Sequence, residues 1–205
     1  MLVIGLCGGS GSGKGTVCSL FSKHGIPSID TDAVYRELTA SNSPCTQALK
    51  DAFGNEIMSE SGALNRKALS KLVFCGSDSK EKLRTLNQIS HKFILEETRS
   101  RLKAYNEKGY QAAIIDAPVL FESGFDSECD IIISVVAETN VRLSRIMLRD
   151  NISEEAAKSR IAAQLSNEEL ISRSDLVIEN NSDIIDLEKR INEIVELLNN
   201  NYIER

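Results

Sequence analysis

Short, unbroken runs of apolar residues recur along the chain and predict buried β-strands. The runs cover residues 2–7, 26–30, 112–116, 131–137 and 176–178, and polar residues or glycines bound each one. A strand that is covered on both faces does not need to alternate apolar with polar residues. Runs of this kind therefore indicate the interior of a parallel sheet.

Between these runs, apolar residues are spaced three and four apart, which predicts amphipathic helices. Such spacing is seen at Leu83, Leu86, Ile89 and Phe93, and again at Ile184, Leu187, Ile191, Ile194 and Leu198. Ser182 or Asp183 is placed to cap the last of these helices. Alternation of strands and helices predicts βαβ units and a three-layer α/β fold.

Composition narrows the class of protein. The chain has 205 residues, of which 41% are hydrophobic and 26% charged, as in ordinary globular proteins. No apolar run approaches the ~20 residues of a membrane span, and the N-terminus does not resemble a signal peptide. The five cysteines are scattered without a CxxC pair, which favours reduced thiols in the cytoplasm. The net charge of −6 argues against a nucleic-acid partner.

The stretch GLCGGSGSGKGTV, residues 5–17, predicts a phosphate-binding loop between a strand and a helix. It matches the P-loop pattern at Gly8, Gly13 and Lys14, but Gly15 stands where Ser or Thr is usual. The alternative is a glycine-rich turn without a ligand, although the GKGT ending also resembles adenylate kinases. The residues expected to bind ATP phosphates are Gly9, Ser10, Gly11, Ser12, Gly13, Lys14, Gly15 and Thr16.

Acidic residues follow two of the predicted strands. Asp30 and Asp32 lie in IDTDAVYREL, and in an extended chain they point to the same side. One of them could accept a proton from an attacking hydroxyl, and the other could orient hydrated Mg²⁺. Asp116 ends a further strand and is a second candidate for a Mg²⁺-bound water. The simpler alternatives are that Asp32 caps a helix and that Asp116 bonds to the loop starting at Pro118.

Arginines mark one face of a predicted helix, since Arg142, Arg145 and Arg149 are three and four residues apart. They could stabilise a transferring phosphoryl group, or they could simply form a solvated helix face. The polar helical stretch 151–173 follows them and is a candidate lid. Arg160 and Gln164 lie one helical turn apart within it.

The chain resembles the dephospho-coenzyme A kinase family over essentially its whole length. The resemblance rests on GGSGSGKGT, GIPSIDTDAVYREL, APVLFESG, SRIMLRDNISEEAAKSRIAAQ and DLVIENN, in that order. It implies a five-stranded P-loop kinase core, a helical CoA-binding region and a lid. It also implies transfer of the ATP γ-phosphate to the 3′-hydroxyl of dephospho-CoA, which gives coenzyme A.

The resemblance also implies roles for individual residues. Asp32 matches the general base, and Lys14 with its loop matches the ATP phosphate site. Arg145 matches a lid-base arginine with Arg149 nearby, and Asn180 lies where the family approaches adenine. The residues implied on the acceptor side are Arg66 and His91, although Lys92 replaces the proline that usually follows the histidine.

We therefore expect one P-loop kinase domain with ATP and Mg²⁺ as its cofactors. Its core is expected at 1–35, 110–140 and 174–205, its helical region at about 36–109 and its lid at about 141–173. Gly15 departs from the Lys-Ser-Thr ending of the family, so Mg²⁺ is expected to bind through waters oriented by Thr16, Asp30 or Asp116. Two other functions stay open, a nucleoside monophosphate kinase and a non-catalytic ATP-binding module.

Overall fold

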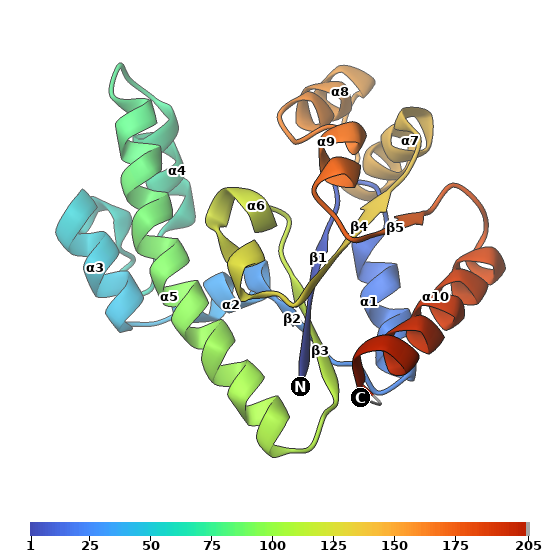
Figure 1. The fold of residues 1–205 in the computed structure, drawn as a ribbon. Coiled ribbons are helices and arrows are strands. Elements are labelled where there is room, and N and C mark those ends of the chain that lie inside the picture. The colour runs from blue at the N-terminus through green and yellow to red at the C-terminus, as the bar shows by residue number, and fades with distance from the viewer. Residues whose placement is uncertain (204–205) are drawn as a thin grey trace. The chain divides into compact units, whose positions relative to one another are not determined.

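The computed structural model describes residues 1–203 and contains the predicted five-stranded parallel sheet (Figure 1). The strands are β1 (Leu2–Cys7), β2 (Ser28–Asp30), β3 (Ala112–Asp116), β4 (Ile131–Val136) and β5 (Leu176–Glu179). Their order across the sheet is β2-β3-β1-β4-β5. The central strand β1 pairs in parallel with β3, where Leu6 faces Asp116, and with β4. The predicted strands are confirmed, with β2 beginning two residues later than expected.

Helices connect the strands, as the apolar spacing predicted. They are α1 (Lys14–Lys23), α2 (Thr31–Leu38), α3 (Pro44–Phe53), α4 (Arg66–Phe74), α5 (Ser79–Glu107), α6 (Leu120–Ser123), α7 (Thr139–Asp150), α8 (Glu154–Ala162), α9 (Asn167–Ser172) and α10 (Ile184–Leu198). Short helical turns are η1 (Asn55–Ile57), η2 (Phe125–Glu128) and η3 (Asn199–Ile203). Within residues 1–203, no helix combines the length and the apolar character that crossing a membrane requires.

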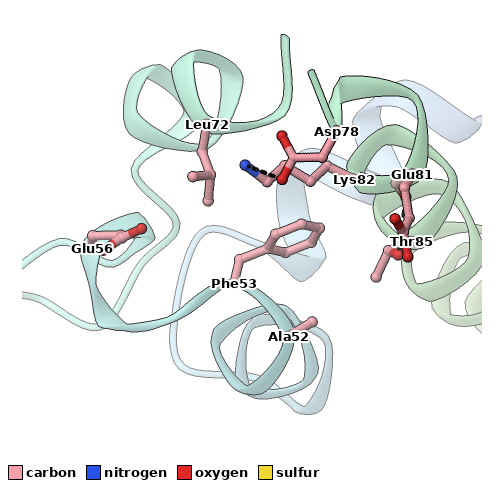
Figure 2. Close-up of a pocket in the computed structure, with 8 residues that line it drawn as sticks. All are labelled: Ala52, Phe53, Glu56, Leu72, Asp78, Glu81, Lys82 and Thr85. Carbon is pink, nitrogen blue, oxygen red and sulfur yellow. Dashed lines mark hydrogen bonds and ion pairs between the residues drawn. The ribbon is translucent and has the colours of Figure 1, made fainter. Parts of the chain in front are cut away.

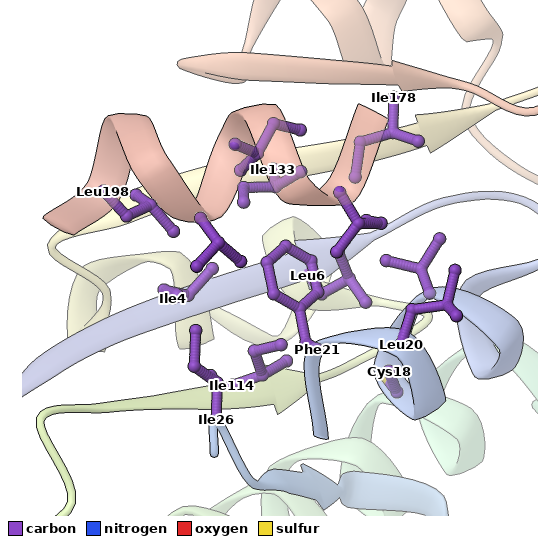
Figure 3. Packing of buried hydrophobic residues seen from close by; sticks show 14 of the residues in the cluster. Ile4, Leu6, Cys18, Leu20, Phe21, Ile26, Ile114, Ile133, Ile178 and Leu198 are labelled. Atoms are coloured by element: carbon purple, nitrogen blue, oxygen red, sulfur yellow. The ribbon is translucent and has the colours of Figure 1, made fainter. Parts of the chain in front are cut away.

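The main core lies between the sheet and helices α1 and α10 (Figure 3). Side chains alternate along β1, so Ile4 and Leu6 point into this core together with Phe21 of α1. Gly5 faces the other side of the sheet, where a Cβ would lie 3.0 Å from Leu120 of α6. Burial of each such side chain contributes about 1.5–3 kcal/mol, which fixes α1 and the loop before it on the sheet.

Helix α10 carries the predicted apolar face and the predicted cap. Its N-cap is Asp183, whose carboxylate accepts hydrogen bonds from the backbone N–H groups of Ile185 and Asp186. Leu187, Ile191, Ile194 and Leu198 are buried in the core, as expected. Ile184, in contrast, is 50% exposed, because it lies on the first turn beyond the edge of the core.

The described chain divides into two compact units, one formed by residues 1–29 with the chain from 104 onward, the other by residues 30–103. The second, helical unit has its own core, in which Leu49, Ile57 and Val73 are fully buried. Its bounds differ from the predicted 36–109, because α2 packs by way of Tyr35 and Leu38 on this smaller core. Asp30 and Asp32 therefore belong to the helical unit.

Candidate nucleotide-binding site

A cavity of about 320 Å³ lies over the loop between β1 and α1. Its lining residues are Gly9, Ser10, Gly11, Gly13, Lys14, Gly15, Thr16, Arg145 and Arg149. Seven of these residues belong to the predicted phosphate loop. The other two, Arg145 and Arg149, are arginines that the helix spacing predicted.

The loop delivers backbone N–H groups to the cavity because α1 starts without a side-chain cap. Its N-cap is Gly13, which has a φ of 97° and no side chain to satisfy the first N–H groups of the helix. Gly11 also has a positive φ, 79°, which turns the chain toward α1. An anion in the cavity would accept those N–H groups and interact with the positive end of the helix dipole.

Lys14, which lines the cavity, is paired with a carboxylate. Its Nζ lies 3.3 Å from Oδ1 of Asp116, at the end of β3, and the thiol of Cys18 donates to Oδ2 of the same carboxylate at 3.6 Å. Burial, followed by the charge of Asp116, raises the pKa of the Cys18 thiol to about 12, so the thiol stays a donor. Asp116 thus contacts two residues of α1. Its proposed role toward a Mg²⁺-bound water and the alternative bond to the loop starting at Pro118 both stay predictions.

The three spaced arginines do not share one environment, contrary to the single cationic stripe that their spacing predicted. Arg142 is 2% exposed and donates its Nε to the backbone oxygen of Ser10 at 3.0 Å. Arg145 donates its Nη1 to the backbone oxygens of Gly11 and Asn180. Only Arg145 and Arg149 line the cavity. The helix face is the predicted one, but its first arginine is buried behind the loop.

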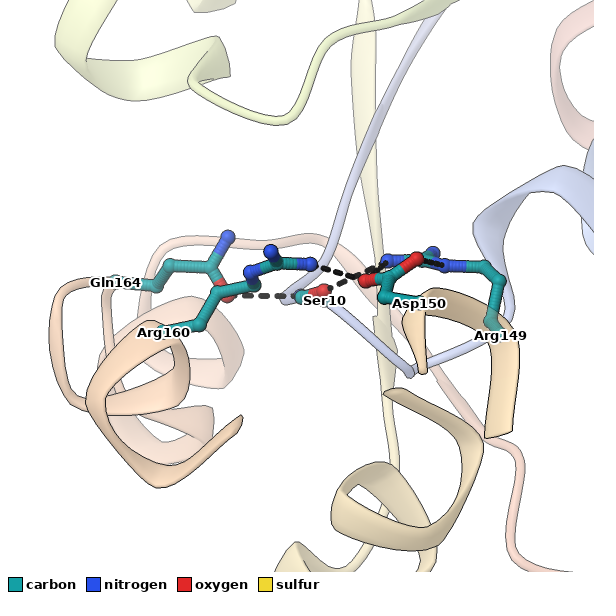
Figure 4. Close-up of polar contacts among 5 residues, drawn as sticks. All are labelled: Ser10, Arg149, Asp150, Arg160 and Gln164. Carbon is teal, nitrogen blue, oxygen red and sulfur yellow. Dashed lines mark hydrogen bonds and ion pairs between the residues drawn. The ribbon is translucent and has the colours of Figure 1, made fainter. Parts of the chain in front are cut away.

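Arg149 is oriented by a carboxylate that sequence reasoning missed. Asp150 accepts the Nε and Nη2 of Arg149 at 2.7 and 2.9 Å, and it also pairs with Arg160 (Figure 4). These partners, Arg149 foremost, hold the pKa of Asp150 near 2. Arg149 also donates to Oγ of Ser10 at 3.4 Å. The only sequence signal for this carboxylate was its position directly after Arg149.

Gln164, from the segment between α8 and α9, contacts the loop directly. Its Oε1 accepts the backbone N–H of Ser10 at 2.8 Å and the Nη2 of Arg142 at 3.4 Å (Figure 4 shows the contact with Ser10). The predicted lid is thus helical, with α7, α8 and α9, and one of its residues binds the phosphate loop. Whether the segment moves stays a prediction.

Asn180 supports the loop from behind. It is buried, and its Nδ2 donates to the backbone oxygen of Ser12 at 2.8 Å. Asn180 does not line the cavity. Its contact with the phosphate loop was not predicted from the sequence. The implied role near adenine stays a prediction.

In the helical unit, Asp30 and not Asp32 caps α2. Asp30 is the N-cap of α2, and its Oδ1 accepts the N–H of Ala33 while its Oδ2 pairs with Arg36. Asp32 is exposed in the first turn of the helix. The alternative in which Asp32 caps α2 is therefore wrong. The two aspartates also do not lie on one extended strand, because β2 ends at Asp30 and α2 begins at Thr31.

The predicted acceptor residues of the helical unit are held by contacts within it. Arg66 donates its Nη2 to Oγ1 of Thr39 at 2.7 Å and lies over the ring of Tyr35. His91 is half-buried, and burial lowers the pKa of its imidazole. Their roles toward a substrate, like the approach of Asp32 to the phosphate loop, stay predictions.

A second cavity, of about 360 Å³, lies inside the helical unit (Figure 2). Phe53 and Leu72 point into it, and an ion pair between Lys82 and Asp78, 3.0 Å long, closes one side. None of the predicted substrate residues lines this cavity, so it does not add to the candidate site.

Comparisons with known proteins place the chain among kinases. A family model described as dephospho-CoA kinase matches residues 2–186. The chain is 39% identical to a dephospho-CoA kinase of Fusobacterium nucleatum, over 97% of this chain and 99% of that protein. It is 38% identical to a dephospho-CoA kinase of Saccharomyces cerevisiae, over 96% of this chain and 82% of that protein.

Solved structures show the same fold. A crystal structure of a Thermus thermophilus protein covers 96% of this chain and 97% of its own, with a TM-score of 0.79 and 30% identity. A dephospho-CoA kinase from Campylobacter jejuni covers 96% of each chain with a TM-score of 0.70, but at 23% identity that likeness speaks for the fold alone.

Proposed function

The chain belongs to the dephospho-CoA kinase family, and we propose that it transfers the γ-phosphoryl group of ATP to the ribose 3′-hydroxyl of dephospho-CoA to give coenzyme A. The proposed ATP site rests on one observation, the cavity at the start of α1. Backbone N–H groups of the first helical turn, one lysine and two arginines surround this cavity. The five free cysteines favour a reducing, cytoplasmic setting.

The proposed ATP site would act by positioning the phosphates and by neutralising their charge. ATP phosphates in the cavity would accept the N–H groups of the loop and would draw Lys14 away from Asp116. Arg145 and Arg149 also line the cavity, where they can neutralise charge that develops on the transferred group. Because Arg145 is also bonded to the loop backbone, its guanidinium needs little rearrangement during the reaction.

The residues around the loop fit a weakly held magnesium ion. Within residues 1–203 there is no cluster of three or more carboxylate, thiolate or imidazole groups that could cage a metal. Mg²⁺ commonly binds through one or two carboxylates, water and substrate phosphates, so Thr16 and Asp116 are sufficient candidates. Asp30 is a further candidate, and its two oxygens already bond to the N–H of Ala33 and to Arg36. The ion would supply charge neutralisation on the phosphate oxygens.

On the acceptor side, Asp32 is the proposed general base. Asp30 caps α2, so the exposed carboxylate of Asp32 does not act as the helix cap. It would accept the proton of the 3′-hydroxyl as that oxygen attacks the γ-phosphorus. Arg66 and His91, in the same unit, are proposed to contact dephospho-CoA.

A substrate panel tests the activity. ADP release is measured with dephospho-CoA, AMP, UMP and CMP as acceptors, and we expect turnover with dephospho-CoA alone. Faster turnover with a monophosphate would instead identify a nucleoside monophosphate kinase. ATP binding without turnover of any acceptor would identify a non-catalytic module.

Replacement of Asp32 by Asn tests the base. We expect Asp32→Asn to lower kcat by ~10²–10⁴ while ATP binding stays unchanged, because the lost group acts on the acceptor proton. Asp30→Asn is the matched control, since asparagine also caps helices and should leave kcat nearly intact. A kcat for Asp32→Asn within a fewfold of the parent would exclude Asp32 as the base.

A further inference from the structure

Arg142 is a buried cation whose hydrogen-bond partners are all neutral. Its guanidinium donates to the backbone oxygen of Ser10 at 3.0 Å, to Oδ1 of Asn167 at 3.3 Å and to Oε1 of Gln164 at 3.4 Å. No carboxylate of residues 1–203 forms an ion pair with it. Burial without a counter-ion lowers the pKa of this side chain.

A buried charge without a counter-ion is costly to keep. Two cations that line the cavity avoid this cost, because Lys14 is paired with Asp116 and Arg149 with Asp150. The charges of Lys14 and Arg149 therefore each have a carboxylate partner before a ligand arrives. Arg145, like Arg142, donates only to neutral oxygens, but it is only partly buried. The charge of Arg142 has no such partner within residues 1–203, although Arg142 is the most buried of these four side chains.

The position of Arg142 explains what this charge can act on. A Cβ placed on Gly9 would lie 2.2 Å from Nη2 of Arg142, so the guanidinium packs directly against the loop at that residue. Gly9 also lines the cavity. Only the loop backbone therefore separates the guanidinium from the space in which phosphates are proposed to bind.

We propose that Arg142 is a positioning residue that serves as a fixed counter-charge for the polyphosphate of ATP, acting through the backbone of the loop. The proposal rests on ATP being the phosphoryl donor. The proposal also gives Gln164 a role. Its neutral Oε1 bonds to both Ser10 and Arg142 and leaves the charge of Arg142 in place. A carboxylate there would make the same hydrogen bonds but would cancel the charge on which the ligand depends.

Four variants separate charge from shape. Arg142→Gln removes the charge and keeps a polar side chain, whereas Arg142→Lys keeps the charge. Gln164→Glu keeps the acceptor and adds a negative charge beside Arg142. Ala162→Glu adds the same charge at an exposed position at the end of α8 and is its control.

Binding of ATP and of inorganic tripolyphosphate is measured by calorimetry, with circular dichroism to confirm folding. We expect Arg142→Gln and Gln164→Glu each to weaken both ligands by roughly tenfold, since one charge is removed or cancelled close to several phosphate charges. Arg142→Lys and Ala162→Glu should stay within ~2–3-fold of the parent, because each leaves the charge behind the loop in place.

The outcomes are distinct. If Gln164→Glu binds both ligands as tightly as Ala162→Glu, or if Arg142→Lys loses as much as Arg142→Gln, the fixed charge has no role and the proposal is overturned. If the parent protein does not bind ATP at all, the proposed donor itself is wrong. Because Gln164→Glu keeps every hydrogen bond, it decides the matter even if Arg142→Gln does not fold.

Discussion

The glycines at the back of the phosphate loop are closely packed, whereas Gly15 at its front is not. At the back, a Cβ on Gly11 would lie 2.7 Å from the backbone oxygen of Arg142, and one on Gly13 would lie 2.2 Å from Nδ2 of Asn180. At the front, no atom lies within 4 Å of a Cβ on Gly15, which is exposed in the first turn of α1.

The glycines of the phosphate loop therefore have different roles, although they look alike in the sequence. The glycines at the back let α7 and Asn180 approach the loop and hold its backbone oxygens. Gly15 serves no such contact, and no positive φ requires it. Steric crowding therefore does not explain why glycine replaces serine at this position.

The largest effect is expected at the back of the loop, for Gly11→Ala. The methyl group meets the backbone of α7, which cannot rotate away, and the positive φ adds strain. We expect ATP binding to weaken on the order of 10²-fold through displacement of the loop, as measured by calorimetry. Near-normal affinity in a folded Gly11→Ala protein would mean that the loop adjusts freely and that the comparison fails.

A smaller effect is expected for Asn180→Ala, which removes one support at the back without adding a clash. The backbone oxygen of Ser12 loses the shorter of its two donors and keeps Arg145 at 3.4 Å, a loss of about 1–2 kcal/mol, so ATP affinity should fall roughly tenfold. Asn181→Ala is the control, since Asn181 accepts the N–H of Glu138 and does not contact the loop. Equal losses in both variants would argue against a specific role for Asn180.

At the front, Gly15→Ser should fold normally and should affect only the metal. The hydroxyl offers Mg²⁺ a direct ligand, so the Mg²⁺ concentration for half-maximal rate should fall by roughly 2–5-fold while kcat changes little. Titration of Mg²⁺ at saturating ATP measures it. An unchanged Mg²⁺ requirement would show that the absent hydroxyl has no cost in this protein.

The smallest effect is expected for Asp150→Asn, which removes the carboxylate that pairs with Arg149. The pKa of Asp150 is lowered from 3.8 to about 2, so its charged form stabilises the fold above about pH 4, and this contribution is lost as the pH falls through 2. Because the pair is exposed, we expect the Tm to fall by about 1–2 °C at pH 7. This difference should vanish near pH 2. A pH-independent difference would assign the effect to something other than charge.

The sequence by itself determined the strands, the position of the phosphate loop and the family. These follow from local signals, since unbroken apolar runs predict buried strands and GGSGSGKGT must join a strand to a helix to bind phosphate. Spacing also placed Arg142, Arg145 and Arg149 on one face of α7, because the period of a helix is fixed by its own backbone.

Only the tertiary structure decided what those side chains meet. Arg142 is buried against Ser10, 132 residues away in the sequence, whereas Arg149 is paired with its own neighbour Asp150. Helix spacing cannot distinguish these outcomes, because they depend on how α7 packs against a loop from the other end of the chain. Likewise, Asp30 rather than Asp32 caps α2, because the helix begins at Thr31, between the two aspartates.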